Sequence, residues 1–300
     1  MLAADLYRPA RPRRALLLVH GLSAAGRRQP ELARLARLLA GHGQLVLVPD
    51  FPGLKAFRLS GREVEEILGG LDHLAARGLP VGLAGFSFGA GPALLAAAER
   101  PALALVGSFG GYADLRHLIA FITTGAHTHG GRRWVARPEE YNRWKLLALL
   151  VGFVEDARDR AALEAVAARR LARPADDTAA LEAGLGPEGR SVLALVLNRR
   201  EADVAPLLAR LSPHARGALD RLSPLARAGR IRARLLLAHG TGDDSIPFTE
   251  SLRLGEAAGG GARVVLLETF HHTGPGRFWA SLLPRARDTW RLVGLADALL

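Results

Sequence analysis

Cysteine is absent from this 300-residue sequence. Disulfide bonds, a thiolate nucleophile and cysteine-ligated metal sites are therefore excluded, and the sequence gives no redox clue to the compartment. Long apolar runs are absent too, because the longest, Leu146 to Val154, is far too short to span a bilayer. The opening residues MLAADLYRPARPRR have no apolar segment ahead of their charges. We therefore expect no targeting signal, no integral membrane segment and a cytoplasmic location.

Lysine is scarce, since Lys55 and Lys145 are the only two, yet abundant arginine gives a formal net charge of +11. The arginines are spread along the chain without a long basic block or interleaved aromatic residues. Nucleic-acid binding needs a clustered basic surface, so we expect no nucleic-acid partner. We attribute the abundance of arginine to a bias of the coding sequence. Binding to anionic lipid as a peripheral membrane protein stays open as an alternative.

Short apolar runs recur along the chain, and none of them alternates with period two. Continuous runs of this length are typical of strands buried on both faces, as in a parallel sheet. Helical patterns lie between several of them, which predicts an α/β fold with a doubly wound, mainly parallel sheet. The runs that predict strands are 15–21, 44–50, 81–86, 102–110, 233–240 and 262–268.

The alternation of strand and helix stops between Tyr112 and about Arg232, where no convincing strand pattern is present. An ordinary crossover between parallel strands needs about a quarter of that length. We therefore expect one domain over residues 1–300 with a helical insertion at about 113–230. Open α/β sheets bind ligands at the carboxyl edge of the strands, so the insertion is expected to be a lid over that edge. A helical subdomain that only adds stability is the alternative.

One serine lies in a frame of glycines and phenylalanines, AGFSFGAG at residues 84–91. A strand pattern precedes it and an alanine- and leucine-rich helical pattern follows it. Glycines permit a backbone turn in which a Cβ atom would clash. A G-x-S-x-G motif between a strand and a helix is the setting that exposes a nucleophilic serine. The motif therefore predicts Ser87 as a nucleophile, and a serine that only caps the helix is the alternative.

Four ordered motifs resemble the α/β-hydrolase superfamily over nearly the whole chain: LVHGLS, GFSFG, HGTGDDSIP and FHHT. Within the superfamily, the sequence is similar to a group of bacterial hydrolases without assigned substrates. The resemblance implies a triad in the order Ser, Asp, His. Its pattern H-G-x-x-D-x-x-[VI]-P places the acid on Asp243, with Asp244 as the alternative. The stretch ADLYRP resembles the family's second strand, so a full first hairpin is not expected.

The base and the oxyanion hole follow from the same resemblance. Family loops of the form F-x-H followed by Thr or Val place the base second, which favours His272 over the adjacent His271. Two backbone N–H groups are expected to hold the oxyanion, one from Phe88 after the nucleophile and one from Leu22 in the loop after LLLVHG. His20 and Asp50 are expected to be structural.

These residues predict hydrolysis of a carboxylic ester through an acyl-serine. Phe86, Phe88 and the apolar insertion favour a small-molecule ester with an apolar acyl group. Amide or thioester hydrolysis and acyl transfer use the same groups, and a non-catalytic binding protein of this fold is the rival from another class. We expect no cofactor and no metal, because no carboxylate lies close in sequence to His127 and His129.

Overall fold

A sheet of seven strands forms the centre of the computed structural model, which describes residues 2–268, 270–271 and 274–275. The strand order is β1-β3-β2-β4-β5-β8-β9, and all pairs are parallel except β1 with β3. The predicted α/β fold with a mainly parallel sheet is confirmed, and each of the six apolar runs overlaps one strand of the sheet. The strands are β1 (Ala4–Tyr7), β2 (Arg14–Val19), β3 (Gln44–Pro49), β4 (Val81–Phe86), β5 (Leu105–Phe109), β8 (Arg234–Gly240) and β9 (Ala262–Leu267).

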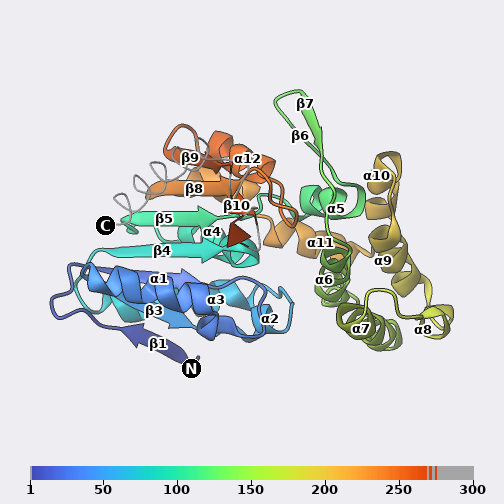
Figure 1. Ribbon diagram of the computed structural model, residues 1–300, viewed down its shortest axis with the longest axis horizontal. Helices are drawn as coiled ribbons and strands as arrows, with labels where there is room; N and C mark the ends of the chain where they lie inside the picture. Colours follow the sequence, from blue (N-terminus) through green and yellow to red (C-terminus); the bar gives the residue numbers. More distant parts are fainter. Residues whose placement is uncertain (1, 269, 272–273, 276–300) are drawn as a thin grey trace.

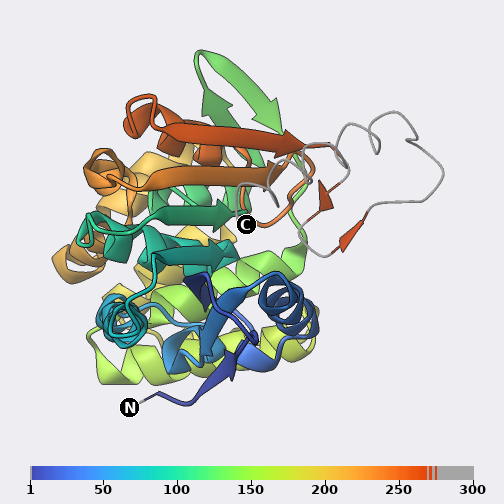
Figure 2. The ribbon, with the colours of Figure 1, turned by 90° about the vertical axis from the view of Figure 1, so that its left-hand side faces the viewer.

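Helices cover both faces of the sheet because the central strands carry apolar side chains on both sides. Leu17 and Val19 of β2 belong to a core cluster with α3 and α4, whereas Leu16 and Leu18 pack with α1 on the opposite face. Figure 2 shows α1 separated from α3 by the sheet. The helices of this part are α1 (Pro30–Gly41), α2 (Pro52–Lys55), α3 (Arg62–Ala75), α4 (Ala90–Ala98) and α12 (Thr249–Ala257), with short 3-10 turns η1 (Gly26–Arg28) and η2 (Ser87–Gly89).

The segment 113–230 connects β5 to β8 and lies beyond the end to which the arrowheads of β4 and β5 point (Figure 1). It is mostly helical, as expected. Among the described residues, no helix here or elsewhere is long and apolar enough to cross a membrane. The elements of the segment are α5 (Leu115–Thr124), β6 (Ala126–His129), β7 (Arg132–Val135), α6 (Glu140–Val151), α7 (Ala157–Ala172), α8 (Ala179–Ala183), α9 (Pro187–Leu197), α10 (Glu201–Ala209), α11 (Pro213–Leu222) and η3 (Leu225–Arg230).

Two buried charges hold the helices of this segment together by binding helix ends. The guanidinium of Arg143, on α6, donates to the carbonyls of Val196, Asn198 and Thr123 at the carboxyl ends of α9 and α5. Asp159, on α7, accepts backbone N–H groups at the start of α9, including that of Gly189 at 2.6 Å. Helix ends leave such groups unpaired, and their partial charges favour a cation at the carboxyl end and an anion at the amino end.

The expectation that segment 113–230 contains no strand was wrong, because β6 and β7 form an antiparallel hairpin. Its turn is Gly130–Gly131, with φ of 54° and 74°, conformations that glycine adopts without strain. In Figure 2 the hairpin projects away from the sheet. The apolar pattern did not indicate these strands because histidine, threonine and arginine fill most of their positions.

The turn from β4 into α4 is packed so closely that glycine is required at its base. A Cβ atom added to Gly85 would lie 2.5 Å from Ala90 Cα and 2.8 Å from Ala93 Cβ. A Cβ atom on Gly89 would clash with the carbonyl oxygen of His20. The strand, the helix and the loop after β2 therefore touch through their backbones at this point.

We predict that Gly85→Ala lowers the free energy of unfolding by about 1–3 kcal/mol, because the backbone of α4 has to move away from β4. Gly69→Ala is the matched control, since Gly69 is an exposed glycine within α3 whose added Cβ would meet nothing within 4 Å. That control should raise stability by about 0.5–1 kcal/mol. Urea unfolding of the two variants measures both values, and equal effects would contradict the close packing at Gly85.

Candidate active site

Ser87 directly follows β4 and has φ of 52°, in the left-handed region that side-chain-bearing residues seldom adopt. That conformation costs about 1–2 kcal/mol, so the surrounding packing must maintain it. A Cβ atom added to Gly21 would lie 2.9 Å from Ser87 Cβ and 3.4 Å from its Oγ. The loop after β2 therefore passes directly against the serine side chain.

The two expected oxyanion donors directly follow the residues of this contact, Leu22 after Gly21 and Phe88 after Ser87. Phe88 is the second residue of η2. The first N–H groups of a helical turn have no acceptor within the helix, and the N–H of Phe88 is one of these groups. The Phe88 side chain is 5% exposed and lies against Tyr112, so the ring contributes to the core. Leu22 follows Gly21 in the loop that meets Ser87 and is half-buried.

His20 fixes the same loop, as expected for a structural histidine. Its Nε2 accepts the backbone N–H of Phe51 at 3.1 Å, and its Nδ1 lies 2.8 Å from the carbonyl oxygen of Gly21. These two partners require the neutral ring with its proton on Nδ1. Burial lowers the pKa of His20; the Gly21 bond and the Asp50 charge oppose this shift without cancelling it, and the Lys55 charge adds to it.

Asp50 lies in a cluster of ions at the end of β3. It accepts the backbone N–H of Arg27 at 2.9 Å, pairs with the Arg27 guanidinium and binds Lys55 Nζ at 3.1 Å. Burial alone raises the pKa of Asp50, but the bonds and charges of Arg27 and Lys55 outweigh it and lower the pKa below its ordinary value. These contacts tie η1 to β3 and agree with a structural role.

Asp243 lies in the loop after β8 and has only 5% of its side chain exposed. Its Oδ1 accepts the backbone N–H groups of Ser245 and Ile246, each at 2.9 Å. Its Oδ2 faces the end of β5, because a Cβ atom on Gly110 would lie 3.5 Å from it. The alternative acid Asp244 is half-buried, and its carboxylate contacts Ser245 Oγ at 3.3 Å. Of the two carboxylates, that of Asp243 is the one held towards β5.

The loop 241–248 between β8 and α12 carries Asp243 and is called the acid loop here. His239, to which the sequence analysis gave no role, holds this loop by hydrogen bonds from the end of β8. It is 1% exposed, its Nε2 lies 2.9 Å from the Ile246 carbonyl, and its Nδ1 lies 2.7 Å from Ser251 Oγ. The same Nε2 is 3.5 Å from Asp243 Oδ2. His239 opens the H-G-x-x-D motif, so its spacing from Asp243 was a usable signal for this role.

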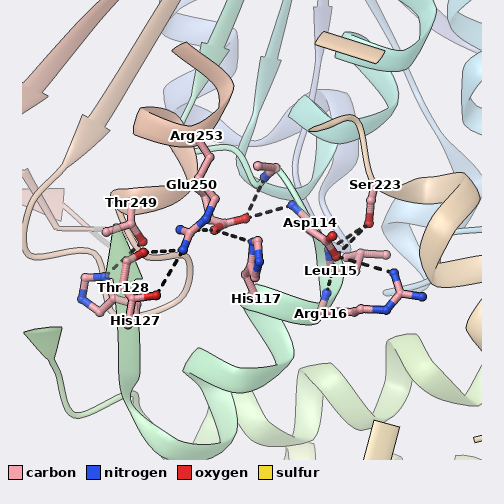
Figure 3. A network of polar contacts seen from close by, with 11 residues as sticks. Asp114, Leu115, Arg116, His117, His127, Thr128, Ser223, Thr249, Glu250 and Arg253 are labelled. Carbon is pink, nitrogen blue, oxygen red and sulfur yellow. Dashed lines mark hydrogen bonds and ion pairs between the residues drawn. The ribbon is translucent and has the colours of Figure 1, made fainter. Parts of the chain in front are cut away.

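Glu250 on α12 anchors the far end of the acid loop and was also missed (Figure 3). This fully buried carboxylate accepts the backbone N–H groups of Ala113 at 3.0 Å and Asp114 at 2.9 Å, and Arg253 pairs with it at 3.1 Å. It thus joins the start of segment 113–230 to the helix that follows the acid loop. Ala113 and Glu250 are 137 positions apart, so no local pattern in the sequence could indicate the hydrogen bond between them.

The expected base, His272, lies outside the described residues. Its alternative, His271, belongs to β10 (Phe270–His271), which pairs with β11 (Gly274–Pro275). The β10 backbone contacts β8, the strand that leads to Asp243. The other expected site residues follow the carboxyl ends of three strands of the sheet: Leu22 follows β2, Ser87 and Phe88 follow β4, and Asp243 follows β8.

The histidines of the hairpin have protein partners. His127 Nδ1 lies 3.1 Å from Thr249 Oγ1, and its ring packs against Trp134 and Phe248. His129 pairs with Glu256 at 3.1 Å. In the part of the chain that the structure describes, no group of three or more histidine, aspartate or glutamate side chains is arranged to hold a metal ion.

The lowered pKa of His20 predicts a pH-dependent stability. In the unfolded chain the His20 ring binds a proton near pH 6.5, whereas in the folded protein the same ring is protonated only at a lower pH. The stabilising contribution is therefore complete above about pH 6.5 and is lost as the pH falls towards the folded pKa, with at most ~1.4 kcal/mol per pH unit. His20→Gln should make unfolding free energy less dependent on pH between 7 and 5.

The slope in this variant should become shallower rather than zero, because burial and the Arg253 charge also lower the pKa of His127. Urea unfolding at several pH values measures the slope. His73→Gln removes an exposed histidine of α3 and serves as the matched control, expected to behave as wild type. A wild-type slope in His20→Gln would refute the assignment of the neutral ring.

Several solved structures have a fold similar to that of this chain. The sequence matches no protein-family model and no curated protein. Among solved structures, it is similar to the esterase domain of a Rhodothermus marinus protein (TM-score 0.51, 18% identity, 96% of this chain and 91% of that one) and to the alpha/beta hydrolase GrgF from Penicillium sp. sh18 (0.57, 16%, 99% and 92%).

A third similar structure is the Pyrococcus horikoshii acylaminoacyl peptidase, with a TM-score of 0.53 and 14% identity over 99% of this chain. The chain spans only 39% of that longer protein. At these identities the similarity concerns the fold. The order of strands, the turn at Ser87 and these structural relatives together show that the chain has the α/β-hydrolase fold.

Proposed function

We propose that the protein is a serine hydrolase that cleaves carboxylic esters through an acyl-serine intermediate. The observation that carries this proposal is the left-handed backbone of Ser87 between β4 and α4, directly against the loop after β2. A strained, glycine-framed serine at the carboxyl edge of a parallel sheet is the feature expected of an exposed nucleophile. A serine that merely capped α4 would not require that backbone conformation.

In the proposed reaction, Ser87 Oγ attacks the ester carbonyl while His272 takes its proton. Asp243 orients the imidazole and stabilises its charged form, and the N–H groups of Leu22 and Phe88 bind the oxyanion. The imidazolium then protonates the leaving alcohol, which leaves an acyl-serine. Water, activated by the same base, hydrolyses this ester and frees the enzyme.

We further propose that segment 113–230 is a lid that sets acyl specificity. It lies beyond the carboxyl ends of β4 and β5 (Figure 1), where ligands bind in open α/β sheets. Phe86, stacked on Phe109 with ring centroids 5.0 Å apart, and Leu22 place half-buried apolar surface near the serine. This surface favours an ester with an apolar acyl group.

Ser87→Ala tests the nucleophile. The variant should fold normally and lose hydrolysis of p-nitrophenyl esters by at least ~10³-fold, because a triad acts as a unit. Labelling with a fluorophosphonate probe should be lost as well, and a p-nitroanilide series separates ester from amide cleavage. Ser23→Ala, a change in the neighbouring loop, is a control that should retain labelling. Labelling of Ser87→Ala at the wild-type level would refute the proposed nucleophile.

The adjacent histidines make a separate prediction about the base. A triad uses one imidazole as its base, so the two adjacent histidines compete for a single role. His272→Ala should lower kcat at least ~10³-fold, whereas His271→Ala should lower it less than ~10-fold. Steady-state kinetics with a p-nitrophenyl ester gives both values. The reverse ranking would place the base at His271.

A further inference from the structure

A continuous series of hydrogen bonds runs from α6 to the carboxylate of Asp243. Lys145 Nζ donates to Asn142 Oδ1 at 3.3 Å, and Asn142 Nδ2 donates to the carbonyl oxygen of Asp244 at 3.1 Å. That carbonyl belongs to the same peptide group as the N–H of Ser245, which donates to Asp243 Oδ1 at 2.9 Å. Every donor in the series points towards the Asp243 carboxylate.

The amide of Asn142 can take only one orientation in this series. The ammonium of Lys145 is a donor only, so the amide oxygen must face it. The carbonyl of Asp244 is an acceptor only, so the amide nitrogen must face that side. Both contacts therefore require the same arrangement of an amide group whose residue is 3% exposed. Hydrogen bonds that follow one another in this way polarise and strengthen each other.

The charge at the start of the series is only partly solvated. Lys145 is half-buried, and among the described residues its one hydrogen bond goes to Asn142. Its ammonium also lies 4.6 Å from the centre of the Tyr141 ring. Burial lowers the pKa of Lys145, and the charges of Asp244, Glu139 and Asp243 oppose this shift without cancelling it. A half-buried cation polarises its single acceptor more strongly than a fully solvated one.

We propose that Asn142 and Lys145 are positioning residues that hold Asp243 in its catalytic orientation through the Asp244–Ser245 peptide. Asn142 fixes the plane of this peptide, and Lys145 polarises it so that the Ser245 N–H binds the carboxylate more strongly. Both residues belong to α6, so the placement of segment 113–230 is coupled to the triad acid. This proposal rests on the serine hydrolase function and adds to it a role of the segment in turnover.

The test uses four single variants of the full-length protein with p-nitrophenyl acetate, an ester too small to need the apolar acyl surface. Asn142→Asp keeps the side-chain shape but cannot donate to Asp244, and Asn142→Ala removes the amide. Each should lower kcat about 10-fold with KM within about twofold, as expected when an outer partner of a catalytic group is lost. Lys145→Met should lower kcat about 3-fold, and Lys145→Arg should restore it.

A double-mutant cycle separates the series from a general effect on the fold. If Lys145 acts through Asn142, the variant that combines Lys145→Met with Asn142→Ala should lose no more activity than Asn142→Ala alone. Arg199→Met is the matched control, because the Arg199 side chain is 66% exposed, pairs with Glu140 of α6 and lies outside the series. It should keep wild-type kcat, and thermal unfolding verifies that every variant is folded.

Three outcomes would overturn the proposal: kcat unchanged in the Asn142 variants, losses that multiply in the double variant, or a rise in KM that accounts for the loss of kcat/KM. Failure of the serine hydrolase function is recognised separately. In that case the wild-type protein would neither hydrolyse the ester nor react with a fluorophosphonate, whereas failure of the positioning role leaves both reactions of the wild type intact.

Discussion

Close backbone contact around Ser87 is the constraint on which the rest of the site depends. Gly85 lets α4 pack directly onto β4, and Gly89 and Gly21 let the loop after β2 reach the serine. This contact maintains a backbone conformation that costs about 1–2 kcal/mol at a residue with a side chain. His20, neutral and buried, ties the same loop to the end of β3, so the expected oxyanion donor Leu22 belongs to a braced segment.

The acid loop is supported from three directions. His239 bonds it from the sheet, Glu250 joins the helix that follows it to the start of segment 113–230, and Asn142 bonds its Asp244–Ser245 peptide from α6. Two of these supports involve segment 113–230, which the sequence analysis predicted to be a lid, with a helical subdomain that only adds stability as the alternative. The contacts indicate that this segment is part of the frame of the site, in addition to any role in covering it.

Much of the fold could be predicted because its signals are local. The apolar runs that became β4 and β8 are continuous, and the glycines of residues 85–91 permit the sharp turn between a strand and a helix. The hairpin of β6 and β7 could not be predicted from apolar periodicity, because its polar side chains conceal the strands. Its Gly130–Gly131 turn was the one available signal.

The sequence by itself determined the strands of the sheet and the strand–serine–helix turn, since each depends on residue types within a few positions of one another. The order of the expected triad residues came from the resemblance of separate motifs to a known superfamily. Only the tertiary structure decided which groups hold those residues in place. Asn142 bonds Asp244 across 102 positions, and Glu250 bonds Ala113 across 137. A hydrogen bond of this kind needs a donor and an acceptor about 3 Å apart, a distance that the packing of segment 113–230 beside α12 and the loop after β8 creates and that no local pattern contains.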